Sequence, residues 1–374
     1  MNIIIAGDFA PGYRIAKAIE KNQYQHCFKQ VRKITLASDY ALVNLECPIV
    51  NSKASPIVKC GPNLKCTSEV VKAIKYTGFQ GVTLANNHIY DFGETGLVDT
   101  ITTLTTNQID YIGGGRNLSE ASSIFYKTIK DKKLAIINCC EHEFSIATEQ
   151  KGGANPLNPI QQYYAITEAR KSADYVIVIV HGGHEHYQLP SPRMQETYRF
   201  FIDAGADAVI NHHQHCYSGY EEYNNKPIFY GLGNFCFDED GGRDSIWNYG
   251  YIVELQLEET IGFTLHPYEQ CNHSPIIQLL ENIRKIEFEK QIQYLNTIIA
   301  SPKELQKKHK EWMQQDERNW LISLSPFTNR FIQALIRRKF LPFYLPKKKI
   351  TALLNKVTCE AHRDKFIYIL TKQL

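Results

Sequence analysis

The sequence alternates short apolar runs with stretches of helical periodicity. Runs of strand length lie at residues 2–7, 41–46, 81–88, 109–112, 133–140, 174–181 and 207–215. Apolar residues with helical spacing occupy the intervals at residues 13–22, 69–78, 93–108, 163–173 and 195–206. A strand–helix alternation of this kind is typical of α/β folds, in which helices cover sheets of mainly parallel strands. We therefore expect an α/β fold.

The pattern changes towards the C-terminal part. Residues 226–237 and 250–259 still have strand character, and we expect these two stretches to pair with each other. From about residue 275 the strand signals vanish and helical patterns follow. The sequence therefore predicts a first domain over residues 1–272 and a helical region over residues 273–374.

Charge is distributed unevenly between these two parts. Residues 275–374 hold 19 Lys and Arg against 9 Asp and Glu, whereas the remainder of the chain is mildly acidic. The motif "RRKFLPFYLPKKK" mixes basic residues with Phe, Tyr and Leu. This composition suits an anionic membrane surface, an acidic partner such as a synthase complex or a polymer, or a packed helical subdomain with a solvated face. The excess of positive charge is the only feature that favours nucleic-acid binding, and we expect no nucleic-acid binding.

Targeting signals are weak throughout the sequence. The N-terminal stretch has no basic region before its short apolar run, and no run approaches the ~18 apolar residues of a membrane span. The ten cysteines include no CxxC pair. We expect a cytoplasmic protein, with peripheral contact to the inner membrane face as an option for the basic region.

Polar residues end five of the strand-length runs. They are Asp8, Glu46, Asn87 with His88, His181, and the cluster His212–His215. The carboxyl ends of parallel strands meet at one edge of a sheet, where α/β folds place their sites. Carboxylate, amide and imidazole donors without thiolates suit Mn²⁺, Fe²⁺ or Zn²⁺. A single histidine at a strand end is commonly a satisfied polar residue, but five such ends together predict a divalent metal site.

Seven motifs in order resemble one family. They are "GDFAPG", "LVNLECPIV", "GVTLANNHIYDFGETGLVDTITTL", "YIGGGRNLSEA", "VIVHGGHEHYQLPSPRMQ", "GADAVINHHQHC" and "PIFYGLGNFCFD". Over about residues 2–240 the chain resembles the CapA family, named for a capsule poly-γ-glutamate biosynthesis protein, within the calcineurin-like metallophosphoesterase superfamily. The resemblance implies a four-layer α/β sandwich, in which helices flank two central sheets. The helical C-terminal extension, predicted from its own pattern, lies outside the resemblance.

The resemblance also implies roles for individual residues. Asp8, Glu46, Asn87, His181, His213 and His215 match the metal ligands of the superfamily, with Glu46 as the carboxylate that bridges two ions. His88 matches the histidine that acts on the substrate, and Glu185 is a candidate for a substrate or outer-shell role. His212 becomes a spare histidine, either behind the ligands or at the surface. The family also has the segment around Asn234, which is expected to line the pocket.

One position departs from the superfamily pattern. The first strand of the superfamily usually carries Asp-x-His, but the residue two positions after Asp8 is Ala10. One expected ligand of the ion that Asp8 would bind is therefore missing. Glu185 or a neighbour in "HGGHEH" is a candidate to replace this ligand. The alternative is that this ion is bound weakly or is absent.

Three functions fit these residues. The first is a metal-dependent hydrolase of phosphoesterase type in bacterial capsule or exopolysaccharide biosynthesis, where the pathway is implied by the resemblance alone. The second is a non-catalytic metal-binding subunit that holds an anionic polymer in a synthase complex. The third is an amide hydrolase that acts on γ-glutamyl chains, since a Lewis acid with a bound hydroxide does not require phosphorus.

Overall fold

Two β-sheets form the centre of the structure, a computed structural model that describes residues 1–239, 241–315, 317–324, 329–342 and 345–372. The first sheet comprises β16 (Ile277–Leu279), β15 (Ile261–Gln270), β14 (Tyr249–Leu257), β1 (Asn2–Ala10), β2 (Tyr40–Leu45), β3 (Gly81–Thr83) and β4 (Asp110–Ile112) in this spatial order, with β13 (Asn234–Phe237) paired to β1. The second comprises β11 (Tyr220–Tyr223), β12 (Lys226–Phe229), β10 (Ala208–His212), β9 (Tyr175–His181), β7 (Lys132–Cys140) and β6 (Phe125–Ile129). A small sheet pairs β5 (Gly114–Gly115) with β8 (Gly153–Ala154).

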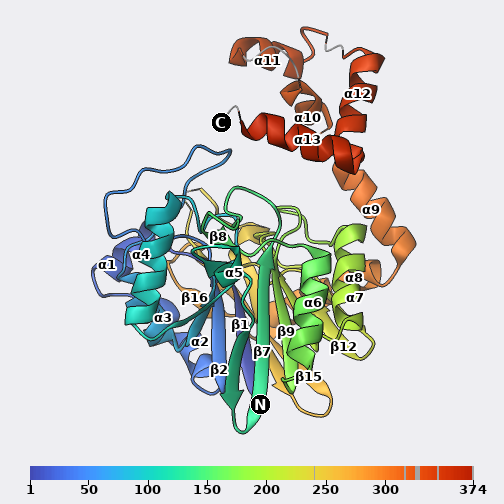
Figure 1. Cartoon of the computed structure of the whole chain (residues 1–374). Coiled ribbons are helices and arrows are strands. Elements are labelled where there is room, and N and C mark those ends of the chain that lie inside the picture. Colours follow the sequence, from blue (N-terminus) through green and yellow to red (C-terminus); the bar gives the residue numbers. More distant parts are fainter. Residues whose placement is uncertain (240, 316, 325–328, 343–344, 373–374) are drawn as a thin grey trace. The chain divides into compact units, whose positions relative to one another are not determined.

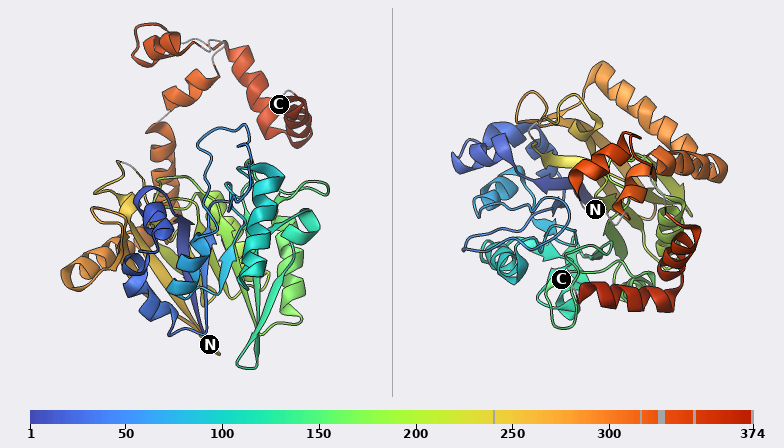
Figure 2. Two further views of the ribbon diagram at one scale, coloured as in Figure 1. Left: turned by 90° about the vertical axis from the view of Figure 1, so that its left-hand side faces the viewer. Right: turned by 90° about the horizontal axis from the view of Figure 1, so that it is seen from above.

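Helices flank the two sheets on both sides (Figures 1 and 2). Those of the first sheet are α1 (Tyr13–Glu20), α2 (Gln25–Thr35), α3 (Val70–Thr77) and α4 (Gly93–Thr106). Helices α6 (Pro159–Arg170) and α7 (Pro192–Asp203) pack on the second sheet, and α8 (Asn282–Ile299) contacts β11. The short helices are α5 (Leu118–Ala121) and the 3₁₀ helix Ile246–Asn248. The predicted four-layer α/β sandwich is confirmed.

The apolar runs explain why these strands lie in the centre. Strands β2 and β9 are buried along almost their whole length, as expected for parallel strands covered on both faces. Helix α1 turns Ile15 and Ile19 towards the core and its charged residues outwards. Helix α3 ends at Gly78, whose φ of 96° is the left-handed conformation that stops a helix at low cost.

Asn138 of β7 links the two sheets. Its side-chain Oδ1 accepts a hydrogen bond from the Ala85 backbone after β3 (2.8 Å), and its Nδ2 donates to the Ile179 carbonyl of β9 (3.0 Å). Gly113 makes this close approach feasible, because a Cβ there would lie 2.1 Å from Asn138 Oδ1. The link holds the C-terminal ends of strands from both sheets next to each other.

Three expectations about local structure need correction. Residues 226–237 and 250–259 do not pair with each other: β12 joins the second sheet, whereas β13 and β14 both pair with β1. The strand β16 lies within a stretch expected to be helical, as an edge strand beside β15. Helix α2 and strand β6 were also missed, although the buried residues of α2 (Cys27, Phe28, Val31 and Thr35) have helical spacing and exposure alternates along β6.

The structure divides into two compact units, Met1–Gln306 and Lys307–Leu374. Helix α9 (Pro302–Gln315) spans the division, and the second unit contains α10 (Glu317–Ser323), α11 (Arg330–Arg337), α12 (Lys347–Thr358) and α13 (Glu360–Thr371). The expected boundary after residue 272 concerns the end of the family-like domain and stays a prediction.

Phe343 and Tyr344 of the basic motif lie outside the described residues. In the part of the chain that the structure describes, no helix has the length and apolar character to cross a membrane.

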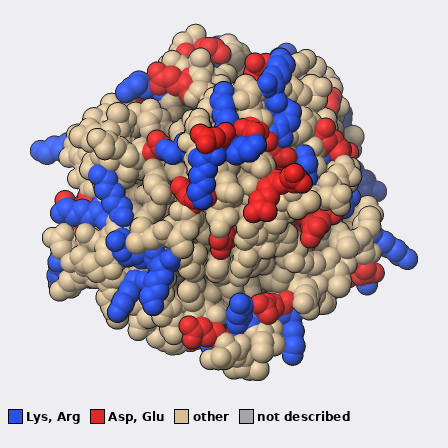
Figure 3. Space-filling model, turned by 90° about the horizontal axis from the view of Figure 1, so that it is seen from below, with Lys and Arg blue, Asp and Glu red and all other residues tan. Residues whose placement is uncertain are grey.

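The N-terminal edge of the strands carries interleaved charges. Figure 3 shows this face, where Lys and Arg lie close to Asp and Glu. Ion pairs join Lys130 to Asp39 (2.6 Å) and Lys132 to Asp174 (3.1 Å). Neighbouring charges of opposite sign cancel at a distance, so these pairs give the edge no strong net field.

Candidate metal centre

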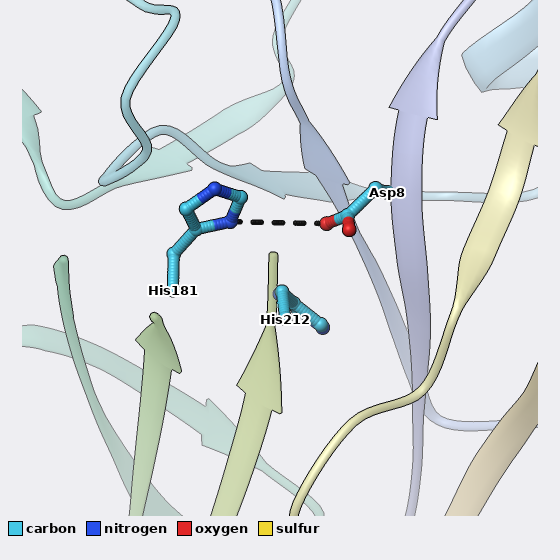
Figure 4. Close-up of side chains that lie close together, drawn as sticks. All are labelled: Asp8, His181 and His212. Carbon is cyan, nitrogen blue, oxygen red and sulfur yellow. Dashed lines mark ion pairs between the residues drawn. The ribbon is translucent and has the colours of Figure 1, made fainter. Parts of the chain in front are cut away.

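The six predicted ligands meet at the C-terminal ends of strands from both sheets. Asp8 belongs to β1, Glu46 follows β2, Asn87 follows β3, His181 ends β9, and His213 and His215 follow β10. None of the six side chains belongs to a residue more than 7% exposed. Figure 4 shows how Asp8 from the first sheet faces His181 and His212 from the second. Residues that are far apart in the sequence therefore form one buried cluster.

The first donor group surrounds His181 Nε2. This nitrogen lies 3.0 Å from Asn87 Oδ1, 3.1 Å from His213 Nδ1 and 3.4 Å from Glu46 Oε1. Donors that share one ion at bond lengths of about 2.0–2.2 Å are separated by about 3.0–3.5 Å. The spacing and the N/O chemistry of these four side chains therefore fit a single divalent ion.

The second donor group consists of Asp8, Glu46 and His215, whose donor atoms lie within 4.8 Å of one another. His215 Nδ1 is 3.7 Å from Asp8 Oδ2, and His215 Nε2 is 3.7 Å from Glu46 Oε1. This group is looser than the first and has one protein ligand fewer. It could hold an ion whose remaining positions are filled by water or substrate.

Glu46 belongs to both groups. Its two carboxylate oxygens are fully buried, and neither accepts a hydrogen bond from any residue that the structure describes. A buried carboxylate without donors is costly, whereas cations on both of its oxygens would compensate for the lost hydration. The orphaned oxygens of Glu46 are therefore the strongest sign that this site is built for metal.

Burial also controls the protonation of the site. It raises the pKa of Asp8 to about 8, with the Glu46 carboxylate adding to the rise, and it raises the pKa of Glu46 to about 7. It lowers the pKa values of His181 and His213 well below the ordinary histidine range, and neighbouring imidazoles act in the same direction. Neutral imidazoles are the form that binds metal, and a cation would reverse the penalty on the carboxylates.

The backbone around the histidine cluster is strained. His213 has φ 93° and His215 has φ 54°, in the left-handed region that residues other than glycine adopt rarely. The backbone N–H of His213 donates a hydrogen bond to Asp8 Oδ2 (3.1 Å). This reversal of the chain after β10 turns both imidazoles towards the carboxylates, and strain of this kind concentrates at functional sites.

Two asparagines hold two of the predicted ligands in place. Asn44 Nδ2 donates to Asp8 Oδ1 (2.7 Å), and Asn234 Oδ1 contacts His215 Nδ1 (2.9 Å). The contact of Asn234 with His215 agrees with its expected place beside the pocket. Sequence reasoning missed Asn44, although a lone Asn inside the apolar run of β2 was an available signal.

His88 lies beside this cluster with two charged partners. Its Nδ1 is 2.7 Å from Asp91 Oδ2 and 3.1 Å from Lys59 Nζ, and Lys59 forms an ion pair with Asp91 Oδ1 (2.5 Å). The Lys59 side chain is only 2% exposed. These contacts occupy Nδ1 and leave Nε2 as the nitrogen that can meet a substrate. Sequence reasoning assigned no role to Lys59 or Asp91.

The remaining histidine-rich segments are placed as follows. Glu185 is exposed, and its carboxylate lies within 4.8 Å of donor atoms of His213 and His215. His212 is buried, so its placement at the surface is excluded, and it groups with Asp8 and His181. Neither of its ring nitrogens has a hydrogen-bond partner among the described residues. Ala10 is buried in β1 opposite Phe237 and offers no ligand atom.

Comparisons with known proteins agree with the sequence motifs. The family of bacterial capsule synthesis proteins termed PGA_cap matches residues 2–239. The capsule biosynthesis protein CapA of Bacillus anthracis is 31% identical over 251 residues, which are 65% of this chain and 61% of that protein. The PGA biosynthesis protein CapA of Bacillus subtilis strain 168 is 33% identical over 240 residues, 63% of each chain. The chain thus spans about three fifths of the length of these relatives.

The similar solved structures are more distant. A phosphatase from Mycoplasma pneumoniae has a TM-score of 0.44 at 14% identity, covering 77% of this chain and 96% of that protein. A 5'-nucleotidase precursor from Thermus thermophilus has the same TM-score at 9% identity, covering 80% of this chain and 59% of that protein. The match over residues 2–239 takes in every predicted site residue. The chain therefore belongs to the PGA_cap family of bacterial capsule synthesis proteins.

Proposed function

We propose that the protein is a metal-dependent hydrolase of phosphoesterase type that acts in capsule biosynthesis. The observation that carries this proposal is the carboxylate of Glu46, which belongs to two groups of buried N and O donors and whose two oxygens have no hydrogen-bond partner among the described residues. Metal ions held by these donors would polarise a substrate oxygen and lower the pKa of a bound water.

The residues of the chain supply the rest of the chemistry. Asn87, His181 and His213 would hold one ion, while Asp8 and His215 would hold the other. His88, fixed through Nδ1 by Asp91, would present Nε2 to a leaving group and deliver a proton or stabilise developing charge there. Glu185 at the exposed side of the cluster would contact the substrate or complete the ligands that Ala10 leaves short.

Two alternatives share the same metal site. Two relatives are named as capsule or PGA biosynthesis proteins, and the poly-γ-glutamate that the family resemblance implies is anionic, which favours an anionic polymer as the bound partner. In the first alternative the protein holds this polymer in a synthase complex without turnover. In the second it hydrolyses γ-glutamyl amide bonds. The second donor group offers only three protein ligands, which favours catalysis, because an open metal position can accept water or substrate.

The experiment combines metal analysis with turnover. Purified full-length protein would be loaded with Mn²⁺ or Zn²⁺, analysed for metal content, and assayed on p-nitrophenyl phosphate, its bis ester and γ-glutamyl amides. We expect bound metal and phosphoester hydrolysis. Turnover of the amides alone would favour the amidase, and a metal-loaded protein inert on all substrates would favour the binding subunit.

A matched pair of variants separates ligands from the acting histidine. Glu46→Gln should lower the metal content and the activity together, because it removes the shared carboxylate. His88→Ala should keep the metal content and lower turnover by about 10²–10⁴-fold, the usual contribution of a general acid or base. If the Glu46 variant retains full metal, its bridging role is wrong.

We further propose that α12 and α13 contact an anionic lipid surface. Neither helix contains a buried residue, and Leu354, Ile367 and Tyr368 are all more than half exposed. The run Lys347–Lys349 opens α12 with three positive charges. Exposed apolar side chains next to a cationic cluster suit the boundary of a membrane with acidic headgroups.

Vesicle sedimentation tests this contact. The full-length protein should pellet with vesicles of phosphatidylglycerol and phosphatidylcholine, and less at high salt. Exchange of Lys347, Lys348 and Lys349 for Gln should release it, whereas the same exchange of the exposed Lys17, Lys21 and Lys29 in the first unit should not. Equal binding to pure phosphatidylcholine, or to soluble polyglutamate instead of vesicles, would contradict the proposal.

A further inference from the structure

The segment that follows β7 touches the ligand Asn87 from outside the metal cluster. Ser145 Oγ donates a hydrogen bond to the Asn87 carbonyl (2.6 Å) and accepts one from the Tyr90 backbone N–H (3.2 Å). These two bonds fix the backbone of the loop that carries Asn87 and His88. The same segment contains Glu143, to which no motif of the sequence assigned a role.

The carboxylate of Glu143 reaches two ligands of the same donor group. Its Oε2 accepts a hydrogen bond from Asn87 Nδ2 (3.2 Å), and its Oε1 lies 3.7 Å from His213 Nε2. On the opposite side of each ligand, Asn87 Oδ1 and His213 Nδ1 lie 3.0 and 3.1 Å from His181 Nε2. Glu143 therefore faces the nitrogen of each ligand that does not point into the cluster.

We propose that Glu143 is a positioning residue that fixes the amide orientation of Asn87 and the tautomer of His213. The inference rests on the proposed metal site. An ionised carboxylate only accepts hydrogen bonds, so it selects the amide orientation with Nδ2 outwards and the imidazole tautomer with the proton on Nε2. Both selections expose a lone pair, on Oδ1 and on Nδ1, to the same ion. Carboxylates behind metal-bound histidines commonly act in this way.

The charge of Glu143, and not only its shape, is needed for this role. A glutamine at this position keeps an acceptor oxygen at only one of the two positions, facing either Asn87 or His213. Its amide group would then face the other ligand and favour the orientation that turns a proton towards the metal. Glu143→Gln should therefore weaken the ion held by Asn87, His181 and His213, while the ion held by Asp8 and His215 is less affected.

The test titrates metal-free full-length protein with Zn²⁺ and follows the heat of binding. We expect two binding events for the wild type. Glu143→Gln should lower the Zn²⁺ affinity of one of them by about 10–100-fold, the usual effect of removing a residue that orients a metal ligand. Glu149 lies on the same loop, is exposed, and provides the matched control. Glu149→Gln removes the same charge and should leave both events unchanged.

A spectroscopic readout separates positioning from a general structural effect. In ¹⁵N-histidine spectra of the Zn²⁺-loaded wild type, His213 should carry its proton on Nε2. This signature should be lost or mixed in Glu143→Gln, while the thermal unfolding temperature stays close to that of the wild type. Wild-type affinity and an unchanged His213 tautomer in the variant would overturn the positioning role alone. Failure of the wild type to bind Zn²⁺ would overturn the proposed function and this inference together.

Discussion

At the scale of single residues, Glu46 and Asp8 dominate the energetics of the site. Both carboxylates are buried beside each other, and for both of them burial is the largest cause of a raised pKa. A pair of this kind cannot be fully ionised at low cost unless positive charge lies next to it. The site therefore couples protonation, folding and metal binding.

The coupling predicts how the metal-free protein responds to pH. With pKa values of about 8 and 7 in the folded state against ordinary values near 4, Asp8 and Glu46 bind protons more strongly when folded. The contribution of these two groups to the free energy of unfolding is then fully present below about pH 4 and is lost as the pH rises through 7 to 8. Urea unfolding of chelator-treated protein should show that the free energy of unfolding declines by an amount on the order of a few kcal/mol between pH 5.5 and 8.5.

Two controls belong to this measurement. Glu46→Gln removes one of the titrating groups and should flatten the decline, and added Zn²⁺ should abolish it because the ion replaces the protons. A variant as pH-dependent as the wild type would show that the loss of stability arises elsewhere in the molecule.

At the scale of elements, loops without regular structure complete the site. The loop at residues 51–65 delivers Lys59 to Asp91 and is fastened there by backbone bonds. Ile57 N–H donates to the Asp91 carbonyl (2.9 Å), and Leu64 N–H donates to Asp91 Oδ2 (2.7 Å). A single buried carboxylate thus anchors both this loop and the ring of His88.

Removal of the Lys59 charge should release the loop. Lys59→Met leaves Asp91 buried without its cationic partner, a loss that costs about 3 kcal/mol or more when a buried pair is broken. Hydrogen exchange at Ile57 and Leu64 should accelerate markedly. The exposed Lys53 in the same loop supplies the control, and Lys53→Met should exchange at the wild-type rate. Unchanged protection in the Lys59 variant would mean that the ion pair does not hold the loop.

Gly7 in β1 packs closely against the segment before β13, and its substitution tests whether this packing positions the second donor group. A Cβ on Gly7 would lie 1.8 Å from the carbonyl oxygen of Gly233, next to Asn234, which contacts His215. Gly7→Ala should therefore displace β13, destabilise the protein by about 3 kcal/mol, and weaken the binding of one ion. At Gly242 a Cβ would meet nothing closer than 3.6 Å, so Gly242→Ala should match the wild type in both measurements. A stable Gly7 variant with normal metal affinity would refute this account.

The sequence predicted the parts of the site that lie at strand ends. Asp8, His181 and His215 come together because the carboxyl ends of parallel strands meet at one edge of a sheet, and the strands themselves can be read from apolar periodicity. Lys59 and Glu143 were not predicted because loops carry them, and the course of a loop depends on long-range contacts. The pairing of β13 and β14 with β1 was missed for the same reason, since periodicity identifies strands but not their partners.

At the scale of the whole molecule, the family match and the charge distribution concern different parts. The match to the PGA_cap family covers residues 2–239, which include the complete donor cluster, whereas the excess of positive charge lies in residues 275–374. The face at the N-terminal strand edge carries interleaved charges (Figure 3). Metal chemistry and surface contact are thus assigned to separate segments of the chain, and each proposal can be tested without disturbing the other.

The most direct test of the two-ion site is an anomalous-scattering map of crystals grown with Mn²⁺ or Zn²⁺. We expect two peaks about 3.5–4 Å apart on either side of the Glu46 carboxylate. One should contact Asn87, His181 and His213, and the other should contact Asp8 and His215. A single peak at the first group would restrict the account to one ion, as the missing ligand at Ala10 allows. Metal-loaded crystals without a peak at Glu46 would contradict it.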